Sequence, residues 1–326
     1  MIVGQDRAVD RFVSAWATRK LHHAWLLAGP KGVGKASFAH SAARRVLAEA
    51  AGPLSDPRGL ETDNDNAIVK LIEAGSHPDM RQLVRLVNEK TGNLARNISV
   101  EQVRDLAEFL ALTPALSPWR VAVIDAADEL EASGANALLK ILEEPPPNTL
   151  FFLVSHAPGR LLPTIRSRCR RLDFVNLDDD AMASILETRA QGLSAVERER
   201  IIAMSGGSAG RALAFAELGL AKLEDSALTI LRQGDPTNAR RSEMALELGK
   251  KGAAERYAAF LELAPSLIAR EARKLEGASR ERALDAYSKA RELAAIAPRL
   301  SLDPASTVFQ IGGILAEVAG PASLKP

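Results

Sequence analysis

Gly29-Pro30-Lys31-Gly32-Val33-Gly34-Lys35-Ala36 lies between an apolar run, 24–28, and a segment, 38–47, whose apolar residues have helical spacing. This is the strand–loop–helix context of a phosphate-binding loop. Gly29, Gly32 and Gly34 let backbone N–H groups turn towards a phosphate, and the helix N-terminus adds partial positive charge. Lys35 is expected to reach the terminal phosphates. The stretch therefore predicts a nucleotide site at the start of an α/β domain.

Two positions that matter for hydrolysis carry alanine. The residue after Lys35 is normally Ser or Thr, whose hydroxyl holds Mg²⁺, but Ala36 has no oxygen. Asp125 ends the apolar run 119–124, as expected for a buried strand that carries a carboxylate to the edge of a parallel sheet. In an active ATPase the next residue is a glutamate that polarises water, and here it is Ala126. Each change alone is compatible with a variant ATPase. Together they favour a nucleotide site that no longer turns over.

The remaining pattern predicts the fold class. Apolar runs alternate with helical spacing as far as residue 174, which indicates a parallel sheet with helices on both faces. From residue 178 onward the pattern is helical, and the later helices have the composition of a bundle. We expect an α/β P-loop domain at 1–176, a small helical domain at 177–230 and a C-terminal helical bundle at 231–326. The expected strands are 24–28, 80–87, 119–124, 150–154 and 172–174, and the expected later helices are 178–190, 194–204, 210–224, 239–274, 279–297 and 303–319.

Composition and charge narrow the class of protein. The chain is 47% hydrophobic and 25% charged, with 42 Lys+Arg against 41 Asp+Glu. This near balance argues against a free-standing nucleic-acid binder. The N-terminus has no signal-peptide pattern, and no apolar run approaches the ~18 residues of a membrane span. A single cysteine, Cys169, excludes an internal disulfide and a Cys-rich zinc site. We expect a cytoplasmic protein with no membrane partner.

Arg168 lies in the densest basic stretch of the chain, 166–171. Clustered arginines usually form a solvated basic turn. The functional alternative is an arginine finger, which supplies positive charge to the nucleotide of a neighbouring subunit. Periodicity does not choose between the two interpretations.

Three further stretches carry a family resemblance. Ile124-Asp125-Ala126-Ala127-Asp128, the run ANALLKILEEPP at 135–146 and Ser167-Arg168-Cys169 resemble bacterial clamp-loader subunits of the AAA+ superfamily, the gamma/tau and delta-prime subunits of DNA polymerase III. The resemblance covers about residues 1–215, and a shared three-domain plan extends it over the whole chain. It implies an AAA+ core, a helical lid and a C-terminal oligomerisation (collar) domain. It also implies gamma/tau ATPase subunits and the delta subunit as partners, with the sliding clamp and primed DNA as indirect ones.

The chain departs from gamma/tau at three places. Ala36 and Ala126 replace Thr and Glu, and Gly210 takes the place of the arginine of a Gly-Ser-x-Arg motif, with Arg211 one step away. The departures match the delta-prime type, which serves as a non-hydrolysing stator. By the same resemblance, Arg168 is the arginine finger that acts in trans on gamma/tau, and Ser155 is at the first sensor position. One alternative is an autonomous, gamma/tau-like ATPase with a variant P-loop, in which Ser37 holds the metal. Another is a passive scaffold that binds no nucleotide.

The resemblance also bears on cofactors. Many family members have four zinc-binding cysteines before a Gly-x-His-Pro-Asp segment. This chain keeps that segment at 75–79, but the preceding loop, 51–66, contains no cysteine. We expect no zinc and no required cofactor, although Lys35 and the loop glycines permit weak binding of ATP or ADP.

Overall fold

The computed structural model describes residues 2–54, 59–87 and 94–319. The chain divides into two compact units, Met1–Ala181 and Met182–Pro326. In the described ranges no helix has the length and apolar character needed to cross a membrane.

The first unit contains a parallel sheet of five strands in its described part, in the order β2-β3-β4-β1-β5. The α/β fold class is therefore confirmed, and every predicted strand is present. The strand predicted at 80–87 is shorter and ends at Leu83. Because all strands run the same way, their carboxyl ends meet at one edge of the sheet. The strands are β1 (Ala24–Ala28), β2 (Met80–Leu83), β3 (Arg120–Asp125), β4 (Thr149–Ser155) and β5 (Arg170–Asp173).

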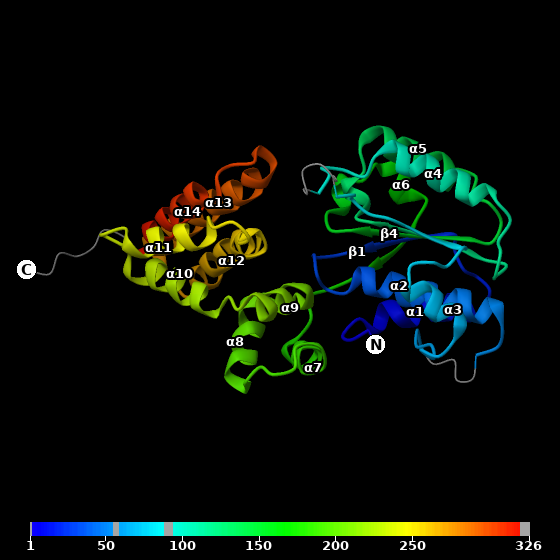
Figure 1. Cartoon of the computed structure of the whole chain (residues 1–326), viewed down its shortest axis with the longest axis horizontal. Helices are drawn as coiled ribbons and strands as arrows, with labels where there is room; N and C mark the ends of the chain where they lie inside the picture. The colour runs from blue at the N-terminus through cyan, green and yellow to red at the C-terminus, as the bar shows by residue number, and fades with distance from the viewer. Residues whose placement is uncertain (1, 55–58, 88–93, 320–326) are drawn as a thin grey trace, which may run out of the picture. The chain divides into compact units, whose positions relative to one another are not determined.

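Helices cover both faces of this sheet (Figure 1). Successive strand residues point to opposite faces, so Trp25 and Leu27 pack under one group of helices and Leu26 under the other. One face is covered by α1 (Asp6–Ala17), α2 (Lys35–Ala51) and α3 (Ala67–Glu73). The other is covered by α4 (Val100–Ala111), α5 (Ala132–Glu143) and α6 (Pro163–Ser167). Two 3₁₀ turns, η1 (Ala127–Glu129) and η2 (Pro158–Arg160), complete the unit.

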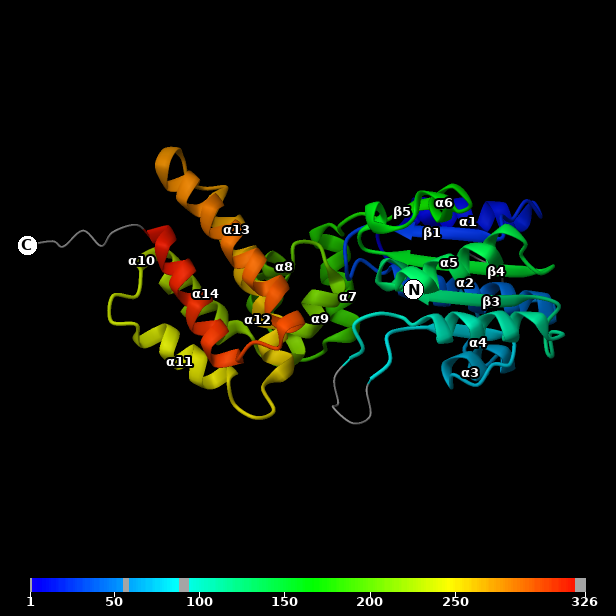
Figure 2. The same cartoon turned by 90° about the horizontal axis from the view of Figure 1, so that it is seen from above.

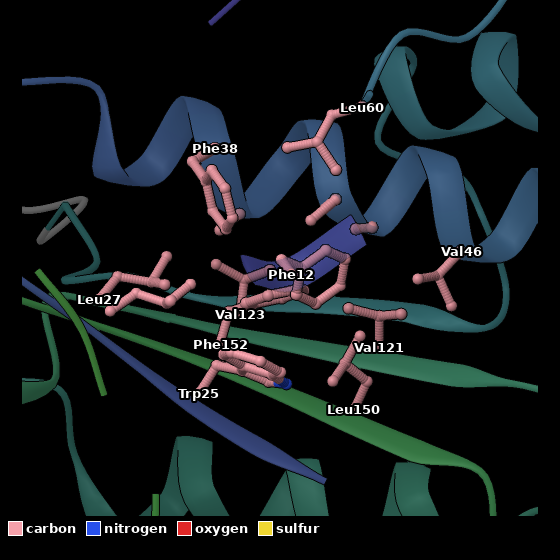
Figure 3. Packing of buried hydrophobic residues seen from close by; sticks show 14 of the residues in the cluster. Phe12, Trp25, Leu27, Phe38, Val46, Leu60, Val121, Val123, Leu150 and Phe152 are labelled. Atoms are coloured by element: carbon pink, nitrogen blue, oxygen red, sulfur yellow. The ribbon is translucent and has the colours of Figure 1, made fainter. Parts of the chain in front are cut away.

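An aromatic cluster fixes α1 and α2 on their face of the sheet (Figure 3). The ring of Phe12 lies 5.3 Å from that of Trp25, 5.9 Å from Phe38 and 5.4 Å from Phe152, measured between centroids. All four side chains are fully buried. Edge-on aromatic contacts add to the free energy of area burial, so this cluster holds α2, and the loop before it, on the sheet.

Asp79 anchors the loop between α4 and β3. Its buried carboxylate accepts the N–H groups of Ala115 (2.6 Å), Leu116 (2.7 Å) and Ser117 (3.0 Å). At the start of α4, Ser99 and Gln102 form a capping box, in which they exchange side-chain and backbone hydrogen bonds. The Gly-x-His-Pro-Asp segment thus has a structural role in this chain.

The Asp79→Asn variant is expected to lower the free energy of unfolding of the first unit by about 2 kcal/mol, because an amide nitrogen cannot accept the N–H groups that a carboxylate oxygen accepts. Urea unfolding followed by tryptophan fluorescence measures this change, since Trp16, Trp25 and Trp119 all lie in the first unit. Asp105→Asn, at an exposed site on α4, is the matched control and should change stability by less than about 0.5 kcal/mol. Equal effects of the two variants would contradict the anchoring role.

The second unit is helical throughout its described part. α14 lies against α10, α11 and α13, and α12 packs on α13 (Figure 2). The helices are α7 (Asp179–Arg189, which begins just before the unit boundary), α8 (Ala195–Ser205), α9 (Ala209–Leu218), α10 (Ala221–Gln233), α11 (Ala239–Leu248), α12 (Ala254–Ala272), α13 (Gly277–Leu300) and α14 (Pro304–Ala319).

Two helices that were predicted to be continuous are each split in two. The helix expected at 210–224 is split into α9 and α10, because Gly219 takes a left-handed conformation (φ 61°) that ends α9. The helix expected at 239–274 is split into α11 and α12 by the segment 249–252. The expected domain boundary at 230/231 falls inside α10, which packs on α11, α12 and α14. α10 therefore belongs with the C-terminal helices.

A buried carboxylate links three helices of the second unit. Glu224 on α10 lies 2.6 Å from Arg200 Nε on α8 and 2.7 Å from Arg270 Nη2 on α12. Glu224 is buried, whereas both arginines are partly exposed. Arg200 also donates to the carbonyl of Ala221 at 2.9 Å and pairs with Asp225. This cluster ties α8 to the helices that follow it.

Candidate functional site

The carboxyl edge of the sheet brings together the residues of the predicted nucleotide site. The P-loop leaves β1 at Ala28, which is paired with Ser155 at the end of β4. The Gly29 N–H donates to the Ser155 carbonyl at 3.3 Å. Asp125 ends β3 and is paired with Val154 of β4. The loop, the strand-end acid and the serine thus come from neighbouring strands.

Gly29 and Gly34 illustrate why the loop needs glycine, and Gly32 also has a positive φ (+78°). Gly29 has φ +155°, and a Cβ there would lie 2.2 Å from the carbonyl oxygen of Phe174, which is far below contact distance. Gly34 has φ +99° and precedes the first turn of α2. An L side chain is strained in that backbone conformation. The glycine pattern is therefore needed for the shape of the loop itself.

Lys35 is folded into the loop. Its side chain is buried, and Nζ donates to the carbonyl oxygen of Gly29 at 2.7 Å and to that of Pro30. Burial lowers the pKa of Lys35 to about 8, against the opposing effect of the Asp128 and Asp125 carboxylates. A phosphate must therefore compete with loop carbonyls for this ammonium group.

The loop has the glycines and the lysine that fit a phosphate, but positions 36 and 126 offer no ligand to its metal. Ala36 and Ala126 offer methyl groups, and Ala126 is itself buried. The acids that follow Asp125 are engaged elsewhere: Asp128 Oδ1 accepts the His156 N–H at 2.9 Å, and Glu129 pairs with Arg85 at 2.7 Å. In the described ranges, no three His, Cys, Asp or Glu side chains are grouped so that they could hold a metal ion. The loop 51–66, which has no zinc-binding cysteines, includes residues 55–58, and these lie outside the described ranges. The absence of zinc therefore stays a prediction.

Sequence reasoning missed three residues at this edge. Gln5 joins the P-loop to the segment after β5, because its Nε2 donates to Val33 O (3.2 Å) and Val175 O (2.8 Å). Asp128 holds the backbone of His156 at 2.9 Å. Burial lowers the pKa of His156, and the positive charge of Lys35 lowers it further. His156 directly follows the end of β4, so the strand-end rule that identified Asp125 also applies to it.

The side chain of Ser155 is fully buried beside the P-loop, and its Oγ has no hydrogen-bond partner among the described residues. A buried hydroxyl of this kind is available to a ligand oxygen at the same edge. The position agrees with a polar contact to a nucleotide, while the sensor role itself stays a prediction.

Arg168 follows α6, away from the loop in sequence but in the same unit. Its Nη2 lies 2.7 Å from Glu143 Oε1, and its Nη1 donates to the carbonyl of Thr164 at 3.0 Å. Two other arginines of the basic stretch differ: Arg170 lies 5.2 Å from the Trp25 ring centroid, and Arg171 pairs with Asp173. The basic stretch is therefore a set of separate contacts, in which Arg168 keeps a partly exposed guanidinium.

Gly210 and Arg211 lie in the first turn of α9. The Arg211 N–H is capped by Ser208 Oγ at 3.3 Å, and its Nε lies 3.9 Å from Glu262 Oε2 on α12. The arginine that is one step from the family position is thus near an acid of its own unit.

Comparison with known proteins identifies the family of this chain. The sequence model of the family described as DNA polymerase III, delta subunit matches residues 4–178, which is more than half of the chain. The chain belongs to the DNA polymerase III delta subunit family. A delta-prime subunit from Pseudomonas aeruginosa is 38% identical over 192 residues, which are 57% of this chain and 53% of that protein. The resemblance drawn from the residues is therefore confirmed.

Other DNA polymerase III subunits are also similar to this chain. A delta-prime subunit from Escherichia coli is 32% identical over 206 residues, covering 63% of this chain and 58% of that protein. A tau subunit from Bacillus subtilis is 33% identical over 181 residues, 56% of this chain and 30% of that protein. The chain thus spans about half the length of the delta-prime relatives that it matches.

Solved structures are similar at low sequence identity. A gamma-subunit-related protein of DNA polymerase III from Thermotoga maritima is 16% identical, with a TM-score of 0.47 over 95% of this chain and 100% of that one. The RuvB Holliday junction branch migration motor of the same organism is 17% identical, with a TM-score of 0.41 over 76% of this chain and 77% of that one.

Proposed function

We propose that this family member is a non-hydrolysing stator subunit of the DNA polymerase III clamp loader, which supplies Arg168 in trans to ATP on a neighbouring gamma/tau subunit. The observation that carries the proposal is the composition of its own nucleotide site. The loop has the glycines of a phosphate-binding loop, but methyl groups stand where the metal ligand and the water-polarising acid are expected. Fast phosphoryl transfer depends on positioned charge, and this site lacks two of its sources.

The site is suited to weak nucleotide binding. Backbone N–H groups of the loop and the first turn of α2 favour a phosphate. Lys35, however, must first leave the carbonyls of Gly29 and Pro30, and Ala36 offers no oxygen to a metal. The negative charge of a triphosphate would remain only partly balanced. We therefore assign this site a structural role, with ATP or ADP binding as an accessory property.

Arg168 has the chemistry that a partner's ATP site needs. Phosphoryl transfer places charge on the equatorial oxygens of the moving phosphoryl group, and a planar guanidinium with several donors stabilises that charge. In the proposed complex the gamma/tau subunits hydrolyse ATP, and the delta subunit, the sliding clamp and primed DNA complete the assembly. The helices that follow α9 would join the ring of subunits.

Nucleotide turnover by the purified chain, alone and within the reconstituted complex, tests this function. We expect no turnover above background for the chain alone. We also expect reduced DNA-stimulated ATPase and clamp loading when the chain is omitted from the complex. Steady turnover by the chain alone at about 1 s⁻¹ or more would overturn the proposal and support an autonomous ATPase in which Ser37 holds the metal.

The affinity of the isolated chain for ADP is expected to fall as the pH rises from 7.5 to 9.5. The pKa of Lys35 is about 8 without ligand, and a bound phosphate raises it. Below pH 8 Lys35 is protonated in both states. Above pH 8 binding must take up a proton, so affinity falls by up to about tenfold per pH unit until the pKa of the bound state is reached.

Isothermal titration calorimetry without Mg²⁺ measures this pH dependence. The matched control is Lys35→Arg, whose guanidinium stays charged over the whole range, so its affinity should not decline. A constant affinity of the unsubstituted chain, or an equal decline in Lys35→Arg, would show that Lys35 does not bind the phosphate.

A further inference from the structure

The guanidinium of Arg168 is held by two groups of its own chain. Glu143 Oε1, on the last residue of α5, lies 2.7 Å from Nη2. The carbonyl of Thr164, in α6, accepts from Nη1 at 3.0 Å. The side chains of Arg168 and Glu143 are 36% and 43% exposed, so the pair lies at the surface of the first unit. An arginine there would otherwise sample many rotamers.

We propose that Glu143 is a positioning residue for Arg168: it holds the guanidinium in one orientation before the neighbouring subunit presents its ATP. The inference rests on the proposed role of Arg168 as a finger in trans. It goes further, because it assigns a function to a residue at the end of α5, 25 residues away in sequence.

The remaining donors of Arg168 make this arrangement compatible with its proposed role. A guanidinium has five N–H donors in a rigid fork, and the two contacts with Glu143 and Thr164 use two of them. Nε and the second hydrogen of each terminal nitrogen remain for phosphate oxygens. Arg168 therefore does not have to release its own chain in order to reach a ligand.

A positioning role also agrees with the exposure of the pair. A solvent-exposed ion pair adds little to the stability of a fold. Its main effect is on the orientation of the two side chains, and an oriented group loses less freedom when it meets a transition state. Removal of Glu143 should therefore change the rate of ATP hydrolysis in the partner and leave the folding of this chain unchanged.

Steady-state ATP hydrolysis by the reconstituted complex, with DNA and clamp present, tests the inference. Glu143→Ala should lower the part of kcat that depends on Arg168 about 3- to 10-fold and leave KM for ATP unchanged, since the partner's own P-loop is intact. Glu143→Gln, which keeps an acceptor oxygen, should restore most of the rate. Glu144→Ala, one residue further along and exposed, is the matched control and should behave as the unsubstituted complex. Gel filtration of each complex and thermal unfolding of each variant chain establish that assembly and folding are equal.

Arg168→Ala, alone and combined with Glu143→Ala, tests the finger role of Arg168 and the positioning role of Glu143 separately. In the Arg168→Ala background, Glu143→Ala should have no further effect. A normal rate for Arg168→Ala would overturn the finger role. A lowered rate for Arg168→Ala, with Glu143→Ala unchanged or faster, would leave the finger role in place and overturn the positioning role. An added loss in the double variant would show that Glu143 acts independently of Arg168, and this would also overturn the positioning role. Failure of both Glu143 variants to fold or assemble would show the same.

Discussion

Replacing Arg168 by alanine is expected to abolish the contribution of one ATP site in the assembled clamp loader. An arginine finger supplied in trans is worth about 10³- to 10⁵-fold in the rate of phosphoryl transfer. We therefore expect hydrolysis at the interface that Arg168 completes to fall about 10³-fold or more, because the transition-state charge there loses its counter-charge. The measured steady-state rate should fall to the level that the other sites of the complex supply. DNA-stimulated ATPase and clamp loading are the two readouts.

The basic stretch contains its own control for this experiment. Arg166→Ala removes the same charge two residues away from an exposed position on α6. It should leave both readouts unchanged, since a general loss of positive charge is not the proposed cause. ATP binding to the partner should also be nearly normal in Arg168→Ala, because the effect is on the transition state. Equal rates for Arg168→Ala and the unsubstituted complex would disprove the finger.

Replacing Glu224 by alanine is expected to lower the free energy of unfolding of the second unit by about 3 kcal/mol or more. The carboxylate is buried, and its removal leaves Arg200 and Arg270 close together without the negative charge between them. Breaking a buried ion pair by removing one partner is strongly destabilising for this reason. The loss should be greatest in the attachment of α8 to α10 and α12.

The placement of the aromatic residues lets this prediction be measured in one sample. Far-UV circular dichroism follows the helices of both units, whereas Trp16, Trp25 and Trp119 all lie in the first unit. In a urea titration of Glu224→Ala, the dichroism should show helix lost at lower urea, with the fluorescence transition unchanged.

Asp225→Ala is the control for Glu224→Ala. Asp225 also pairs with Arg200, but its side chain is 64% exposed, so its removal should cost less than about 1 kcal/mol. If the two variants lose equal stability, or if the fluorescence transition moves with the dichroism, the cluster does not act as a buried link within the second unit.

The sequence predicts well those features that depend on near neighbours or on strand ends. The glycines and Lys35 occur within eight residues of each other. Asp125 was found because it ends an apolar run, and Ser155 because it falls at the first sensor position of the family that the sequence resembles. Parallel strands place both at one edge of the sheet. The presence of alanine at positions 36 and 126 is read directly from the sequence and does not depend on tertiary structure.

Helix continuity and side-chain partners were decided by the tertiary structure. Gly219 and the segment 249–252 break helices that periodicity predicts as continuous, because apolar spacing does not report a left-handed residue. Gln5 bonds to Val175 across 170 positions, and Glu224 meets arginines 24 and 46 positions away. Such contacts depend on how the elements pack, and the spacing of residues along the chain carries no signal for them.

Arg168 illustrates both what the sequence predicts and what only the tertiary structure decides. The sequence by itself determined that an arginine lies in a Ser-Arg-Cys segment, and the resemblance to clamp-loader subunits made a finger the leading hypothesis. Only the tertiary structure brought Glu143 to 2.7 Å from it, because the end of α5 and the end of α6 meet in the folded unit. The physical reason is that a side chain's identity is local, whereas its orientation depends on partners that only packing brings together.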